Sequence, residues 1–123
     1  MPKRKKLPSE HESVRQELCI HTTRGRRVIL VEVGYYDDKH TIGEVFLDIA
    51  KTGSNEKAWC DEVCIGASYS LQQGRPLEEV IERWRQTKFD PCGPVTGHPS
   101  IKFCSSPLDA VAQFLEAEQR GEM

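Results

Sequence analysis

Residues 28–36 read Val-Ile-Leu-Val-Glu-Val-Gly-Tyr-Tyr, which is the strongest strand signal in the sequence. Such a density of β-branched and aromatic side chains favours an extended strand. The turn residues Asp-Asp-Lys-His follow at 37–40. Residues 44–50 then alternate between two faces, with Val45, Leu47 and Ile49 on one and Glu44, Phe46 and Asp48 on the other. Strict alternation is typical of a strand that is buried on one face only. Two such strands joined by a short turn predict antiparallel pairing.

The segments on either side extend this pattern in two different ways. Upstream, residues 14–21 alternate imperfectly, and a glycine turn at 23–26 joins them to the stretch above, which adds a third strand. Downstream, the period changes from that of a strand to that of a helix, which Ser54 or Asn55 can cap. The apolar stripe of this helix consists of Cys60, Val63, Cys64, Ala67 and Leu71.

Two further helices are marked by their termini. Gly74 suits the left-handed position that ends the first helix, and Pro76 suits the first turn of a second one. The apolar stripe of that second helix consists of Leu77, Val80, Ile81 and Trp84. A last helix opens at Ser106 in the form of a capping box, with Asp109 at its third position. Its core-facing side chains are expected to be Leu108, Val111, Ala112 and Leu115.

Residues 88–105 read as a long loop that is rich in proline and glycine. A loop of this length inside a compact domain is usually functional or tied down. We expect His98 and Lys102 to point outward from it, and four apolar side chains to anchor it, namely Phe89, Val95, Ile101 and Phe103. The predicted fold is therefore α+β: a small antiparallel sheet of about three strands, a helical hairpin, the long loop and a C-terminal helix.

The length of 123 residues suits one domain. We expect a basic, flexible arm over 1–12, the domain over 13–118 and a short tail over 119–123. No apolar run is long enough to span a membrane, and the basic start is followed by no apolar stretch, so it does not resemble a secretory signal. Five cysteines in such a chain predict reduced thiols and a cytoplasmic location.

Charge is distributed unevenly along the chain. Residues 1–27 carry eight basic and three acidic side chains, whereas the whole protein has a net charge of -2. One interpretation is an arm that binds nucleic acid or an acidic protein surface, with help from the Arg-Gly-Arg-Arg turn at 24–27. The alternative is a solvated run of lysines, because short basic runs are common.

An ordered series of short stretches resembles the TSCPD domain, the C-terminal domain of adenosylcobalamin-dependent ribonucleotide reductases. The resemblance covers roughly residues 5–117. Its most similar stretches are Lys6-Leu7-Pro8, Gly34-Tyr35-Tyr36-Asp37-Asp38, Gly43-Glu44-Val45-Phe46-Leu47-Asp48, Leu71-Gln72-Gln73-Gly74, Pro76-Leu77-Glu78-Glu79 and Phe89-Asp90-Pro91-Cys92-Gly93. Small members of the family are named for a Thr-Ser-Cys-Pro-Asp stretch, which here reads Cys-Ser-Ser-Pro-Leu-Asp at 104–109.

The resemblance implies a module related to ribonucleotide reductase. A reductase needs a large barrel with a thiyl-forming cysteine, and 123 residues that already form the elements above have no room for one. We therefore expect a stand-alone accessory or regulatory binding protein in deoxynucleotide and DNA synthesis, and not a reductase. Its expected partners are a ribonucleotide reductase or another protein, and a nucleotide or other anion. Neither a cellular nor a viral origin is favoured, and the oligomeric state stays open.

Four cysteines, with His98, come closest to a metal site. Tetrahedral zinc takes four thiolate or imidazole ligands, and the candidates are Cys60, Cys64, Cys92 and Cys104. However, Cys60 and Cys64 lie on an apolar stripe, where a free thiol behaves as a small hydrophobe, and no Cys-x-x-Cys pair is present. We predict no metal and no cofactor, and a small cysteine-based metal or redox protein remains as an alternative.

The long loop is the better candidate for a binding site. The N-terminus of the last helix and the neighbouring side chains could hold an anion such as phosphate. The candidate residues are Lys88, Asp90, His98, Lys102, Ser105 and Ser106. The alternative is that Ser106 only caps its helix and that Lys102 is solvated. Four scattered histidines give no pattern of a catalytic triad, so no catalytic residue is predicted.

Overall fold

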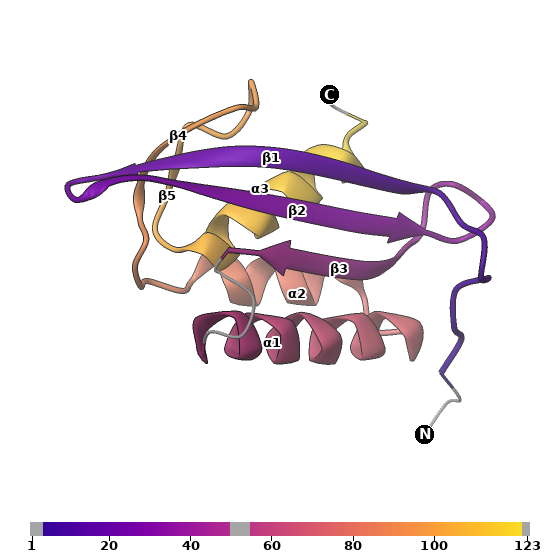
Figure 1. The fold of residues 1–123 in the computed structure, drawn as a ribbon. Helices are drawn as coiled ribbons and strands as arrows, with labels where there is room; N and C mark the ends of the chain where they lie inside the picture. The colour runs from indigo at the N-terminus through magenta and orange to yellow at the C-terminus, as the bar shows by residue number, and fades with distance from the viewer. Residues whose placement is uncertain (1–3, 50–54, 122–123) are drawn as a thin grey trace. The chain divides into compact units, whose positions relative to one another are not determined.

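The computed structural model describes residues 4–49 and 55–121. It is an α+β structure, as the sequence predicts, but its sheet has five strands and not three. In chain order (Figure 1) the elements are β1 (Ser13–Thr22), β2 (Gly25–Tyr35), β3 (Ile42–Asp48), α1 (Asn55–Gln72), α2 (Leu77–Arg85), β4 (Gly93–Thr96), β5 (Phe103–Cys104) and α3 (Pro107–Gln119).

The two additional strands lie within the segment predicted as a loop. The strands are hydrogen-bonded in the order β3-β2-β1-β4-β5. β4 pairs antiparallel with β1, with Ile20 opposite Val95, and with β5, with Gly93 opposite Cys104. Strands of four and two residues are too short to show a period, and their prolines and glycines read as turn signals. The prediction of a long loop over 88–105 was therefore wrong.

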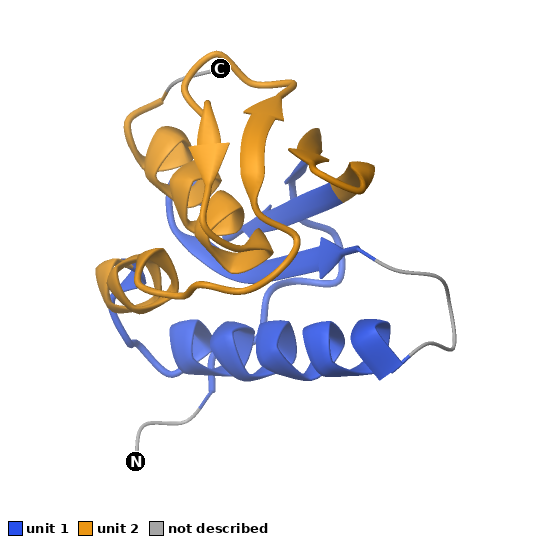
Figure 2. Cartoon of the chain, turned by 90° about the vertical axis from the view of Figure 1, so that its left-hand side faces the viewer, with its two compact units in different colours: residues 1–16, 30–77 blue, residues 17–29, 78–123 orange. Residues whose placement is uncertain are grey.

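The chain forms two compact units (Figure 2). Unit 1 comprises residues 1–16 and 30–77, and unit 2 comprises residues 17–29 and 78–123. The long strands β1 and β2 are each divided between the two units, so each unit is described on its own. Within the described residues, no helix combines the length and the apolar character that a membrane crossing requires.

The core of unit 1 is built on the pairing of β2 with β3. Val33 lies opposite Val45 and Val31 opposite Leu47, and all four side chains are buried. The side chain of Phe46, between them on the strand, is 40% exposed. The predicted alternation of β3 is therefore confirmed.

Helix α1 runs beside β3 (Figure 1), and three of its side chains are bonded to the backbone of that strand. The Gln72 side-chain amide donates to Gly43 O at 3.0 Å. The Ser68 hydroxyl accepts from Val45 N at 3.0 Å and donates to Val45 O at 3.2 Å. The Cys64 sulfur is hydrogen-bonded to the backbone of Leu47. We call these three pairs, 72–43, 68–45 and 64–47, the edge ladder.

The edge ladder works because two periods nearly coincide. Every fourth residue of a helix advances about 6 Å, and every second residue of a strand advances about 6.7 Å. Side chains at 64, 68 and 72 therefore meet strand residues 47, 45 and 43 in turn. Exposed strand edges invite pairing with other chains, and covering them with a helix is one way to prevent this. In unit 1, side chains of α1 take the place of a further strand.

The predicted apolar stripe of α1 is only partly correct. Cys64 and Leu71 are buried, Cys60 and Ala67 are half-buried, and Val63 is exposed. The helix was expected to bury an apolar stripe, but the side it turns towards β3 is centred on Ser68 and also includes Gln72. Of the two predicted caps, Ser54 lies outside the described residues, and Asn55 is the first residue of α1.

The described part of the predicted arm makes specific contacts within unit 1. Lys5 N donates to Gln72 O at 2.7 Å, and Lys5 O accepts from the Tyr36 hydroxyl at 2.5 Å. The Arg4 guanidinium lies 4.0 Å from the centre of the Tyr69 ring. Further along, Glu12 O accepts a hydrogen bond from the backbone of Tyr35 at 2.9 Å. Arg4, Lys5 and Glu12 therefore have defined partners at the end of β2, in the β2–β3 turn and at the end of α1.

The core of unit 2 is formed largely by α3. The cap predicted for this helix is confirmed, because the Ser106 hydroxyl accepts from Asp109 N at 2.9 Å and proline occupies the first turn. Leu108 is only half-buried, whereas Phe114 is 1% exposed. The other fully buried apolar side chains of α3 are Ala110, Val111, Ala112, Leu115 and Ala117. On α2, which the sequence also predicts, Trp84 is the buried residue.

Candidate functional site

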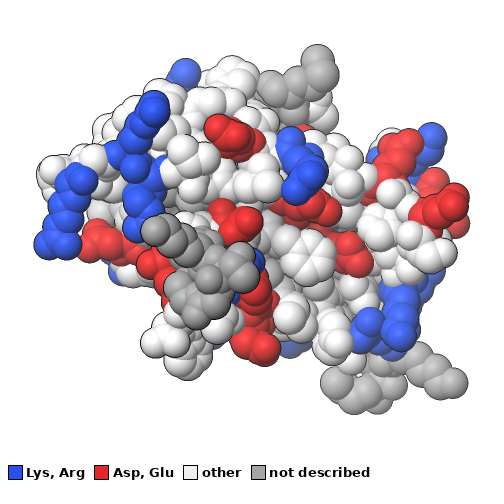
Figure 3. Space-filling view, viewed as in Figure 1, with Lys and Arg blue, Asp and Glu red and all other residues white. Residues whose placement is uncertain are grey.

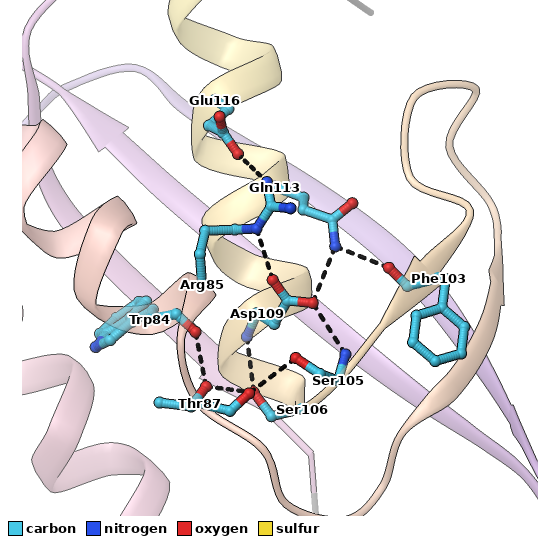
Figure 4. A network of polar contacts seen from close by, with 9 residues as sticks. All are labelled: Trp84, Arg85, Thr87, Phe103, Ser105, Ser106, Asp109, Gln113 and Glu116. Carbon is cyan, nitrogen blue, oxygen red and sulfur yellow. Dashed lines mark hydrogen bonds and ion pairs between the residues drawn. The ribbon is translucent and has the colours of Figure 1, made fainter.

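A network of polar side chains joins the end of α2 to the start of α3 within unit 2 (Figure 4). Its centre is Asp109, which is 5% exposed. One carboxylate oxygen accepts from Ser105 N at 2.9 Å and from the Gln113 amide at 3.1 Å. The other lies 2.8 Å from Nε of Arg85, whose Nη1 pairs with Glu116. Asp109 therefore carries an ion pair in addition to its place in the first turn of α3.

Hydroxyl groups complete this network. Thr87 Oγ1 donates to Trp84 O at 2.7 Å and lies 2.6 Å from Ser106 Oγ. A hydroxyl has one proton, and that of Thr87 is donated to Trp84 O. The Ser106 hydroxyl is therefore the donor to Thr87 Oγ1. Ser105 Oγ in turn donates to Thr87 O at 2.8 Å. The predicted site residues Ser105 and Ser106 are thus brought together, and their contacts hold the segment after α2 against the start of α3.

The contacts of Ser106 and Asp109 bear on the prediction that the N-terminus of α3 binds an anion. The N-terminus of α3 is already occupied by the Ser106 hydroxyl and by the Asp109 carboxylate. An anion placed there would meet a buried negative charge. Sequence reasoning identified the cap but missed Arg85, because nothing in the spacing of α2 and α3 indicates that their side chains meet. Anion binding at this segment stays a prediction.

The other predicted site residues do not converge on one point. His98 is 5% exposed, and its Nδ1 accepts from Ser100 N at 3.1 Å. Its ring packs at 88° to that of Phe114, with centroids 5.9 Å apart. The expectation that His98 points outward was therefore wrong. Lys88, Asp90 and Lys102 are exposed.

The β4–β5 ribbon, residues 88–105, is held against β1 by two close approaches. A Cβ at Gly93 would lie 2.3 Å from His21 O, and one at Gly97 would lie 2.8 Å from Glu17 O. Both glycines also have positive φ, at +145° and +114°, which L side chains rarely adopt. No larger residue fits at either position without movement of the backbone. The β4–β5 ribbon therefore has a fixed position beside β1 within unit 2.

The apolar residues of the ribbon divide into two pairs. Val95 and Ile101 are buried, at 4% and 0% exposure, so their predicted anchoring is confirmed. Phe89 and Phe103 are 47% and 57% exposed, so the prediction that these two rings anchor the segment was wrong. For Phe103 the reason is alternation, since its neighbour Cys104 on β5 points into the core. In Figure 4 the Phe103 ring points away from the polar network.

All five cysteines are free thiols. Burial raises the pKa of the Cys64 thiol to about 12 and that of Cys104 to about 11, so both stay protonated at neutral pH. Desolvation also raises the pKa of Cys60 and of Cys92. Over residues 4–49 and 55–121, no group of three or more His, Cys, Asp or Glu side chains has a geometry that could hold a metal ion.

Unit 1 has an open cavity of about 370 Å³ that sequence reasoning missed. It lies where the start of the described chain meets the β2–β3 turn and the end of α1. Burial raises the pKa of the Tyr36 phenol on its wall, which therefore remains a donor to Lys5 O. The residues that line the cavity are Lys5, Tyr36, Asp38, Thr41, Leu71, Gln72, Gln73 and Gly74.

Comparison with known proteins gives a consistent result. The profile of the TSCPD domain family matches residues 3–119. The vitamin B12-dependent ribonucleotide reductase of Bradyrhizobium diazoefficiens is 34% identical over 115 residues, which is 94% of this chain and 9% of that protein. For the Agrobacterium fabrum reductase the values are 35% over 118 residues, 96% and 9%. For that of Streptantibioticus cattleyicolor they are 31% over 114 residues, 93% and 18%. No solved structure matches the chain significantly.

Proposed function

We propose, because this chain belongs to the TSCPD domain family, that it is an accessory or regulatory binding module of a vitamin B12-dependent ribonucleotide reductase and does not itself reduce nucleotides. The proposal rests on the share of each protein that the match covers. The match takes in 93–96% of this chain but only 9–18% of the reductases to which it is similar. The remaining parts of those enzymes have no counterpart in these 123 residues.

The β4–β5 ribbon supports a role in protein binding. Phe89 and Phe103 expose about half of their side-chain surface on a platform that Gly93 and Gly97 hold in place. Exposed aromatic residues on an ordered surface are enriched in protein interfaces and often carry most of the binding energy. We propose that a reductase contacts this ribbon, with Lys102 at the margin of the contact.

The test is to mix this chain with the intact reductase of Agrobacterium fabrum. Native mass spectrometry reads complex formation, and turnover with and without nucleotides reads regulation. We expect a complex and a changed rate. The Phe103→Ser variant should weaken the complex about tenfold or more if the ring is a hot spot. Phe46→Ser, which alters a phenylalanine of similar exposure on β3, is the matched control and should bind as the unaltered chain does.

Three results are informative. No complex and no change of rate would remove the link to the reductase. A complex that Phe103→Ser and Phe46→Ser leave equally intact would keep the reductase but reject the ribbon as its contact. Binding that disappears only when Phe103 is altered supports both parts. A module of this kind would act in deoxynucleotide synthesis in the cytoplasm, a setting in keeping with five free thiols.

Binding of nucleic acid by the basic residues stays a prediction. The face of the molecule in Figure 3 carries acidic and basic side chains close together. The Arg4 guanidinium lies over the Tyr69 ring, so one basic side chain of the predicted arm contacts the protein itself. If the arm neutralised phosphates, affinity for DNA would fall steeply with salt, and deletion of residues 1–6 would flatten that dependence.

A further inference from the structure

The side of α1 that points away from β3 exposes three large apolar side chains. We call it the outer face of α1, formed by Trp59, Glu62, Val63, Gly66 and Tyr69. Trp59 is 74% exposed, Tyr69 47% and Val63 40%. These positions are spaced by three, four or seven residues, so they share one side of the helix. Two exposed aromatic rings and a valine on one helix face mark an interaction surface.

Gly66 lies in the middle of this face, and none of the described residues around it requires a glycine there. Glycine inside a helix is destabilising relative to alanine. A Cβ at Gly66 would meet no atom within 4 Å, and its φ is not positive. Neither lack of space nor backbone conformation therefore requires glycine here. What glycine permits is the close approach of another backbone from outside.

The residues around Gly66 are arranged so that a second copy of the same helix fits them. A two-fold axis at Gly66 places Val63 opposite Tyr69 of the second copy, because the two lie three residues before and after the centre. It also places Trp59 beside the end of the other helix. Two antiparallel helices related in this way bury all three apolar side chains of both copies.

Charge favours the same partner. The amino-terminal half of the face carries Glu62, with Glu56 in the first turn of the helix. The carboxyl-terminal half carries Arg4, whose guanidinium lies over Tyr69 on this face. In the antiparallel pair, the acidic half of each helix meets the basic half of the other. A single helix thus supplies both the apolar and the charged complement of its own surface.

We propose that the outer face of α1 is a self-association surface, through which two copies of this chain form an antiparallel helix pair centred on Gly66. The inference does not depend on the proposed function. One helix face buries less than the roughly 1,200–2,000 Å² of a standard interface. The dimer is therefore weak, with a dissociation constant in the micromolar to millimolar range.

The experiment measures self-association of the full chain in two ways. Sedimentation velocity from low micromolar to millimolar concentration reads its mass. Tryptophan emission reads the surface itself, because the chain has two tryptophans and only Trp59 is exposed, Trp84 being 6% exposed. We expect the fraction of dimer to rise with protein concentration. We also expect the tryptophan emission to shift to the blue on dimerisation, and this shift to be absent in the Trp59→Phe variant.

Gly66→Leu is the decisive variant. Leucine has a higher helix propensity than glycine and has space at this site, so the fold is retained. The added side chain separates the two helices and should weaken the dimer about tenfold or more. Arg83→Leu adds a leucine to an exposed position of α2 and is the matched control, which should dimerise as the unaltered chain does.

The proposal is overturned if the chain stays monomeric at millimolar concentration with unchanged Trp59 emission. It is also overturned if a dimer forms but Gly66→Leu and Arg83→Leu weaken it equally. A shift of Trp59 emission that needs added reductase, and never occurs with the chain alone, assigns the face to that protein and rejects self-association.

Discussion

Helices α1 and α3 differ in what they bury, although both are long and both lie against strands. α3 buries six apolar side chains, and its one buried polar side chain, Asp109, lies in the first turn. α1 buries Ser68, Gln72 and a thiol, and exposes a tryptophan and a tyrosine. A helix that packs on an apolar core is held there by apolar side chains. A helix along a strand edge is held by side chains that hydrogen-bond to the backbone of the strand. Amphipathicity alone does not tell which side of a helix is buried.

The largest effect is expected on the α3 side of this comparison. Phe114→Ala removes a ring that is 1% exposed and leaves a cavity, so the free energy of unfolding should fall by about 3–5 kcal/mol. Urea unfolding followed by circular dichroism measures this. Phe103→Ala makes the same change on a ring that is 57% exposed and should stay within about 0.5 kcal/mol. Equal losses in the two variants would mean that α3 does not dominate its core.

A smaller but specific effect is expected on the α1 side. Ser68→Ala leaves both Val45 N and Val45 O without their partner, which should cost about 1–3 kcal/mol although almost no apolar area changes. Ser70→Ala, on the same helix, should cost far less. Hydrogen exchange at Val45 should also accelerate in the Ser68 variant. If Ser68→Ala is neutral and Val45 stays protected, the edge ladder does not stabilise the strand.

The smallest effect concerns pH, and on the α1 side it is carried by Cys64. Burial raises the pKa of Cys64 to about 12, against 9.0 for an exposed thiol. Between pH 9 and about 12 the unfolded state therefore loses this proton while the folded state keeps it, so stability falls as pH rises.

At pH 10 this contribution should be on the order of 1 kcal/mol. Comparing urea unfolding at pH 7 and pH 10 measures it. The loss should be smaller in Cys64→Ser, which keeps a polar group for the Leu47 backbone but does not titrate in this range. Cys92→Ser, at an exposed thiol, is the comparison and should reduce the loss less than Cys64→Ser does. An equal loss in Cys64→Ser would contradict the protected thiol.

Several elements could be predicted because their determinants are local. The alternation of β3, the start of α3 at Ser106 and the stop at Gly74 each follow from residues within one or two turns. The β4–β5 ribbon could not be predicted, because its pairing with β1 joins Ile20 to Val95, far apart in the chain. For the candidate site, Ser105 and Ser106 were identified, but the place of His98 in the core was not.

The class of fold, the family and the starts of α2, α3 and the three long strands follow from the sequence, since these depend on periods, caps and short motifs. Only the tertiary structure decided which polar groups are structural. Arg85 meets Asp109, and Ser68 meets Val45, because elements distant in sequence pack together. The tertiary structure also decided which apolar residues remain outside. A side chain's own chemistry is the same buried or exposed, and its neighbours in space determine which of the two it is.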